Sequence, residues 1–160
     1  MAKRTQSIMA VAVIVSVAVL SPASAKPPKS SGPLPASTIR TIYHQVKTIY
    51  AEAGMIGLEA ISSECLDHAK KSKSVPAFQR CVAFDNVASA LDWQYSNLTG
   101  SPRDDYFAEG TMGHRWGVTT RDFPQPNDYA HLKIGELSRE CDRVMGLPPA
   151  WRLPRPQRID

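Results

Sequence analysis

The fold is decided by residues 39–98, which read IRTIYHQVKTIYAEAGMIGLEAISSECLDHAKKSKSVPAFQRCVAFDNVASALDWQYSNL. Helical apolar spacing runs up to a basic turn at residues 70–73, and a second run of helical apolar spacing follows it. Cys65 and Cys81 each lie eight residues from Lys73. Two thiols at equal distances from a turn fall at the same height on antiparallel neighbouring helices. The sequence therefore predicts a helical hairpin closed by a Cys65–Cys81 disulfide.

Before the turn, apolar residues recur at steps of three and four and then change face. The first stripe is Ile39, Ile42, Val46, Ile49, Ala53, Ile56 and Ala60. The second stripe is Leu58, Ile61, Cys65 and Ala69. At about 100° per residue the two stripes point to nearly opposite sides, and Gly54 and Gly57 lie at the change. Because glycine can end or kink a helix, we expect a helix over 37–53, a break or kink, and a second helix over about 58–71. One long helix buried on both sides is the alternative.

After the turn comes the most regular stripe in the chain. It consists of Ala77, Cys81, Phe84, Ala88, Leu91, Tyr95 and Leu98. Pro76 suits the first turn of this helix, and the Gly-Ser-Pro sequence at 100–102 ends it. A last helix begins near Asp128, and its stripe is Ala130, Ile134, Leu137, Cys141 and Val144. Gly146 predicts its end.

The two ends of the chain differ from this helical part. Residues 1–25 have a basic start, an apolar run and the small-residue sequence Ala-Ser-Ala, which is the order of a secretory signal peptide. The apolar run, residues 8–20, is shorter than the roughly 20 residues that span a membrane. Residues 26–36 form a proline-rich linker, and residues 147–160 form a proline- and arginine-rich tail. The helical domain is therefore expected at 37–146.

Charge and cysteine content bound the function classes. Removing the signal peptide removes Lys3 and Arg4, so the net charge falls from +4 to +2. This charge is too small to indicate a nucleic-acid partner. Three cysteines in an exported chain predict one disulfide and one remaining thiol, which fits the bacterial periplasm or secretion. Any pair of cysteines remains possible. Cys65–Cys81 is favoured and Cys81–Cys141 is next, and we expect Cys141 to be a small buried residue.

The segment 100–125 lacks a sustained apolar period and contains glycines, prolines and aromatic residues. We expect a long irregular loop here. The predicted fold is therefore an all-α, up-and-down bundle of three to four helices, with one disulfide and this loop before the last helix.

Residues 106–123 within this loop are the best candidate for a binding site. Tyrosine, tryptophan and arginine dominate the binding energy of protein interfaces, and loops commonly carry function. The candidate binding residues are Tyr106, Phe107, His114, Arg115, Trp116 and Arg121. The alternative is structural: the loop folds back and packs Phe107, Trp116 and Phe123 onto the bundle.

Three residue patterns in the sequence bear on catalysis or metal binding. Glu109, His114 and Arg115 form a possible acid–base and anion-stabilising set. Asp85 and Asp92 are separated by about 10.5 Å along a helix, too far for glycosidase geometry, and are interpreted as charges that meet a basic residue on a neighbouring helix. The histidines lack the i, i+4 spacing of a helical zinc site, so no metal or other cofactor is expected.

The sequence thus predicts a small exported protein that is not an enzyme. We expect it to bind another protein of the cell envelope through residues 106–123, without a nucleic-acid partner or a membrane-spanning segment after signal cleavage. A small exported enzyme that uses Glu109 and His114 is one alternative, and a structural or stress-protective envelope protein is another. The oligomeric state is left open.

Overall fold

The computed structural model describes residues 34–123 and 128–148. Within these ranges the elements are α1 (Ala36–Ser72), α2 (Val75–Thr99), the short 3-10 helix η1 (Asp105–Phe107), α3 (Glu109–Thr120) and α4 (Asp128–Met145). The described part of the chain contains no strand, so the predicted all-α bundle is confirmed. The predicted signal peptide and most of the linker and tail lie outside the described residues.

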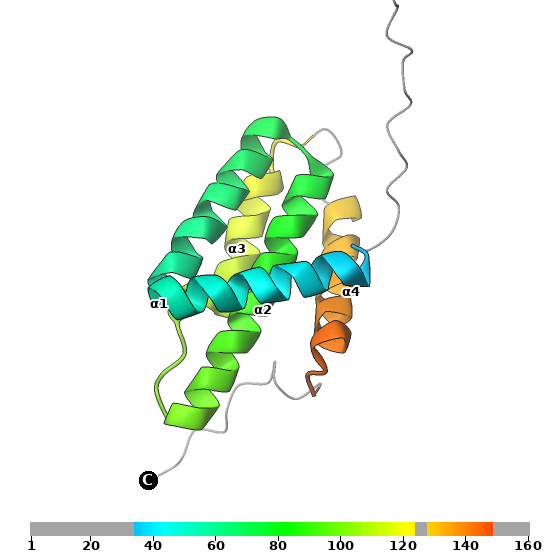
Figure 1. The fold of residues 1–160 in the computed structure, drawn as a ribbon. Coiled ribbons are helices and arrows are strands. Elements are labelled where there is room, and N and C mark those ends of the chain that lie inside the picture. Colours follow the sequence, from blue (N-terminus) through cyan, green and yellow to red (C-terminus); the bar gives the residue numbers. More distant parts are fainter. Residues whose placement is uncertain (1–33, 124–127, 149–160) are drawn as a thin grey trace, which may run out of the picture.

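Helix α1 is sharply kinked at Gly54. Its backbone there has φ 63° and ψ −158°, which is not helical and which residues with a Cβ rarely adopt. Figure 1 shows the two halves of α1 running in different directions, the first half across the bundle and the second half along it. The predicted break is therefore confirmed. Only the first part of the first stripe is buried: Ile39 and Val46 are fully buried and Ile49 is partly buried, whereas Ala53 just before the kink is exposed and Ile56 after it is 80% exposed.

The second half of α1 and α2 form the predicted hairpin. Cys65 and Cys81 are joined in a disulfide with 5.7 Å between their Cα atoms, which confirms the favoured pairing. Lys73 adopts a left-handed conformation that ends α1. The Ser74 side chain accepts a hydrogen bond from the backbone N–H of Ala77 and caps α2. Cys141 lies outside the disulfide and is buried, as predicted.

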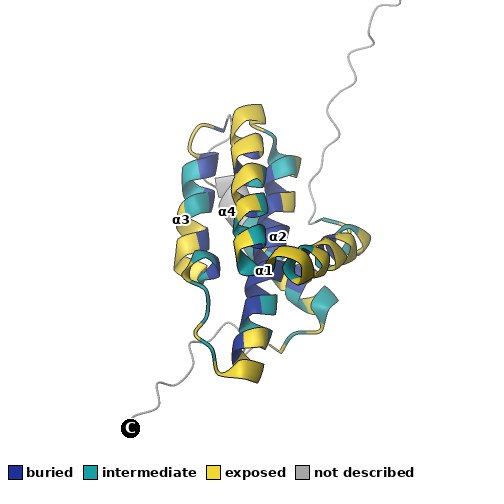
Figure 2. Cartoon of the chain, turned by 60° about the vertical axis from the view of Figure 1, so that its left-hand side comes forward, coloured by how far each residue is buried: buried dark blue, intermediate teal, exposed yellow. Residues whose placement is uncertain are grey.

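Helix α2 is the centre of the bundle, as the burial colours in Figure 2 show. Every residue from 81 to 90 is buried, because α1, α3 and α4 all pack against this helix. The expected one-sided stripe is therefore incomplete as a description. The last two residues of the predicted stripe, Tyr95 and Leu98, are not buried: they are 46% and 87% exposed on the last turns of α2.

The segment expected to be an irregular loop is mostly helical. It contains η1 and the twelve-residue helix α3. Met112, Trp116, Thr119 and Phe123 are buried at steps of four, three and four, which is a helical stripe. The three glycines of α3 concealed this period, since glycine lowers helix propensity. The structural alternative for Phe107, Trp116 and Phe123 is the one observed.

Helix α4 packs against α2 and α1. Among the described side chains of α4, Leu137 and Cys141 are buried. Gly146, with φ 67°, follows its last turn. Among the helices of residues 34–123 and 128–148, none combines the length and the apolar character needed to cross a membrane.

Candidate functional site

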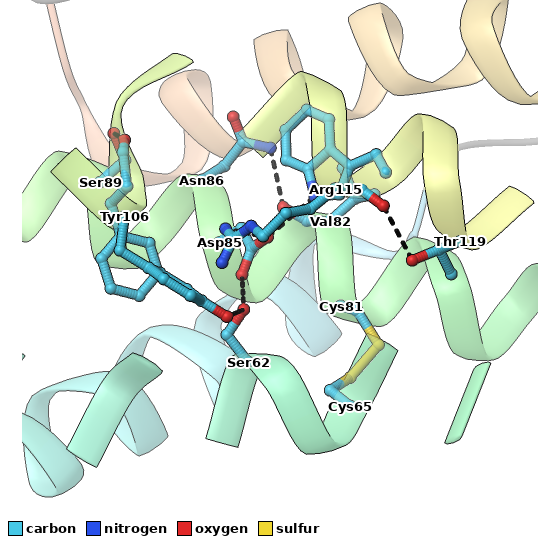
Figure 3. Close-up of polar contacts among 12 residues, drawn as sticks. Ser62, Cys65, Cys81, Val82, Asp85, Asn86, Ser89, Tyr106, Arg115 and Thr119 are labelled. Carbon is cyan, nitrogen blue, oxygen red and sulfur yellow. Dashed lines mark hydrogen bonds and ion pairs between the residues drawn. A yellow bond between two sulfur atoms is a disulfide. The ribbon is translucent and has the colours of Figure 1, made fainter. Parts of the chain in front are cut away.

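The carboxylate of Asp85 on α2 is fully buried and accepts hydrogen bonds from three side chains. Ser62 Oγ on α1 donates to its Oδ1 across 2.5 Å. Trp116 Nε1 and Arg115 Nη2, both on α3, donate to its Oδ2 across 2.8 and 3.1 Å. Figure 3 shows Ser62 and Arg115 converging on Asp85 from two helices. One carboxylate therefore joins α1, α2 and α3.

The arginine of this cluster is held by more than its ion pair. The guanidinium of Arg115 stacks on Tyr106, with 3.5 Å between its central carbon and the ring centroid. The Tyr106 hydroxyl donates to Ser62 Oγ across 3.3 Å, which closes a ring of contacts around Asp85. The Nε and Nη1 atoms of Arg115 are buried and make no hydrogen bond in the structure. The cluster is therefore tightly enclosed but not fully satisfied.

Burial controls the electrostatics of this cluster. Removal from water raises the pKa of Asp85 above its ordinary value. The hydrogen bond from Ser62, the charge of Arg115 and the hydrogen bond from Trp116 act in the opposite direction and only partly offset burial. The hydrogen bonds from Ser62, Trp116 and Arg115 therefore replace the water that burial removes from the Asp85 carboxylate.

A second buried carboxylate, Asp92, holds the connection between α2 and α3. Arg103 Nε lies 3.4 Å from Asp92 Oδ2, and the backbone N–H of Asp104 donates to the same oxygen across 3.1 Å. Ser89 links to this contact, because it accepts from Arg103 Nη2 and donates to the carbonyl of Phe107. Burial also raises the pKa of Asp92 above its ordinary value. These contacts fix η1 against α2.

Sequence reasoning missed that these residues form a buried polar stripe. Asp85, Ser89, Asp92 and Ser96 recur at steps of four, three and four on α2 and are all buried. The signal was present in the sequence, because the same spacing that identifies an apolar face also identifies a polar one. The expectation that Asp85 and Asp92 meet basic residues is correct. Asp85 pairs with Arg115 on a neighbouring helix, whereas the partner of Asp92, Arg103, lies on a connection.

Above the cluster, α1 and α3 border a surface groove with a volume of about 300 Å³. Its walls combine apolar and polar side chains from both helices. The lining residues are Ser63, Leu66, Asp67, Lys70, Tyr106, His114, Arg115, Val118 and Thr119. We call this surface the α1–α3 groove. It brings together three of the six predicted binding residues: Tyr106, His114 and Arg115.

The other predicted binding residues lie elsewhere. Phe107 and Trp116 are 0% and 7% exposed, so neither side chain is available to a partner in this state. Their aromatic side chains pack in the core of the closed structure. Arg121 is exposed just beyond the end of α3 and does not line the groove.

The proposed acid–base set is not assembled. Glu109 lines a different hollow, between α3 and α4, together with Met112 and Trp116. His114 lines the α1–α3 groove. Five residues along a helix place two side chains about 140° apart, which explains the separation. Among the described residues, no three histidine, cysteine, aspartate or glutamate side chains lie close enough together to hold a metal ion.

Comparison with known proteins gives no further guide to the site. No family model, curated protein or solved structure matches this chain.

Proposed function

We propose that this protein is an exported, non-enzymatic binding or accessory protein that engages another protein of the cell envelope through the α1–α3 groove. The main support for this proposal is the set of residues that line the α1–α3 groove. It contains Tyr106, His114 and Arg115, and tyrosine and arginine are among the residues that contribute most to protein interfaces.

The groove is also suited to a protein partner in its construction. Arg115 and Tyr106 are fixed by the contacts around Asp85, so little conformational entropy is lost when a partner binds them. His114, Asp67 and Lys70 are exposed at the rim and offer polar contacts. A rigid centre with a polar rim is the usual anatomy of an interface.

Export is supported by the order of features in residues 1–25 and by the Cys65–Cys81 disulfide. Disulfides form and persist in the periplasm and outside the cell. The proposal predicts a mature chain that begins at Lys26 in the periplasmic or secreted fraction. Intact-mass measurement of the fractionated protein tests this. A full-length chain recovered from the cytoplasm would contradict it.

Site-specific photo-crosslinking in cells tests the groove. A photoreactive residue at Asp67 or His114 lies on either side of the groove, whereas Glu52 on the first half of α1 and Arg139 on α4 are exposed control positions. We expect the two groove positions to give an adduct of the same mass with one envelope protein, and the two controls to give none. Equal crosslinking at all four positions, or none at the groove, would contradict the proposal.

A further inference from the structure

Three features of α3 make it a weak helix on its own. It has twelve residues, and isolated helices of this length are marginal in water. Its N-cap residue, Ala108, provides no side-chain hydrogen bond to the orphan N–H groups of the first turn. Gly110, Gly113 and Gly117 each lower its stability relative to alanine.

The three glycines have no packing role in the structure. Apart from the adjacent residues and the backbone of α3 itself, a Cβ atom built on any of them meets no described atom within 4 Å, and none of them has a positive φ. At about 100° per residue the three glycines lie within about 60° of one another, and their centre is about 110° from the middle of the face that buries Met112 and Trp116. Alanine would therefore fit at each of these positions, and the glycines weaken α3 without serving the closed fold.

What holds α3 in place is tertiary. Met112 and Trp116 are its buried apolar side chains, and Arg115 and Trp116 both bind the single carboxylate of Asp85. By contrast, the second half of α1 and α2 are linked by the disulfide, and residues 81–90 of α2 are buried on every side. The polar attachment of α3 to α2 is thus concentrated at Asp85, whereas the second half of α1 and α2 are also joined covalently.

We infer that α3 is a releasable latch: it undocks from Asp85 while the α1–α2 hairpin stays folded, and this exposes Trp116 and Arg115. The inference goes beyond the proposed function, because the α1–α3 groove exists only while α3 is docked, whereas undocking exposes a different surface. It explains how Trp116, an interface residue by type, lies buried in the closed state. A partner that binds the open state sees an affinity reduced by the fraction of molecules that are open.

Hydrogen exchange of the mature, disulfide-bonded protein tests the latch without any partner. Under native conditions, we expect peptides from 109–120 to exchange about a hundredfold faster than peptides from 81–90, because sub-global opening occurs below the free energy of global unfolding. Gly113→Ala should slow exchange in 109–120 by about two- to fivefold. Asp85→Asn should accelerate exchange in 109–120, and peptides from 81–90, which open only on global unfolding, should remain the slower of the two.

Gly135→Ala on α4 is the matched control, because it makes the same substitution in another helix where the new methyl group meets only the end of Arg139 at 3.7 Å. It should leave exchange in 109–120 unchanged. Equal exchange rates in 109–120 and 81–90, or equal effects of the two alanine substitutions on 109–120, would overturn the latch. Such a failure would leave the groove crosslinking untouched, so the two proposals fail separately.

Discussion

The indole Nε1 of Trp116 on α3 donates a hydrogen bond across 2.8 Å to Oδ2 of Asp85 on α2. Arg115, the preceding residue, donates to the same oxygen. Two neighbouring residues that resemble interface anchors by type are therefore used to dock a helix in the closed state. The exposed surface that remains above them is the α1–α3 groove.

Removal of the Asp85 charge should destabilise the protein strongly. Asp85→Asn leaves the Arg115 cation in a largely buried position without a counter-ion, and breaking a buried ion pair costs about 3–5 kcal/mol. We expect a loss of about 3 kcal/mol in the free energy of unfolding, measured by urea denaturation. Glu136→Gln, which breaks a pair near the surface with Lys133, is the control and should cost less than about 1 kcal/mol. Equal losses for the two variants would refute this assignment.

The raised pKa of Asp85 gives the protein an unusual pH dependence. The folded carboxyl keeps its proton to a higher pH than the unfolded one, whose ordinary pKa is 3.8. The folded state thus binds more protons in the window above pH 3.8, and the free energy of unfolding rises as pH falls through that window. Asp92 shifts in the same direction, so wild type must be compared with Asp85→Asn, in which Asp92 is retained.

In that comparison, the stability advantage of wild type over Asp85→Asn should grow between pH 7 and pH 4. Urea denaturation at several pH values in this range measures it. An advantage that shrinks on acidification would mean that the folded state lowers the pKa of Asp85, contrary to the effect of its burial.

Glycine substitutions should have opposite signs at different positions. Gly113→Ala fills open space on α3 and should stabilise the native state relative to the fully unfolded chain by about 0.5–1 kcal/mol. Gly54→Ala places a Cβ at φ 63° and should destabilise it by about 1 kcal/mol or more. Thermal denaturation followed by circular dichroism at 222 nm distinguishes the two. Stabilisation by Gly54→Ala would contradict the kink.

The disulfide should contribute about 3 kcal/mol, because it closes a loop with a sequence separation of 16 residues. Cys65→Ser with Cys81→Ser should lower the free energy of unfolding by roughly this amount. Alkylation of the non-reduced protein should label one cysteine per chain, Cys141, and only after denaturant exposes it. Labelling of all three cysteines would exclude the bond.

The sequence predicted the hairpin because its signals are local. The kink at Gly54, the start of α2 near Pro76 and the Cys65–Cys81 pair each follow from residue type and spacing over a short stretch of sequence. The groove and the cluster were harder, because they depend on contacts between residues such as Ser62, Asp85 and Arg115, which are 23 and 30 positions apart in sequence. Helix α3 was not predicted, because its three glycines lower the helix propensity of the segment and leave few apolar residues to show a helical period.

Three of the six candidate binding residues line the α1–α3 groove, and three do not. Residue type alone identified Tyr106, His114 and Arg115, but it did not distinguish an aromatic residue that faces solvent from one that packs inward. Once α3 is known to be helical, its period separates the exposed His114 from the buried Trp116.

A double-mutant cycle between Asp85 and Arg115 tests the central claim, that one buried carboxylate on α2 holds α3. Asp85→Asn, Arg115→Gln and the double variant are compared with wild type by urea denaturation. We predict a coupling free energy of about 2 kcal/mol, within the range for side chains in direct contact. Additive effects, with a coupling below about 0.5 kcal/mol, would show that Asp85 does not hold α3 through Arg115.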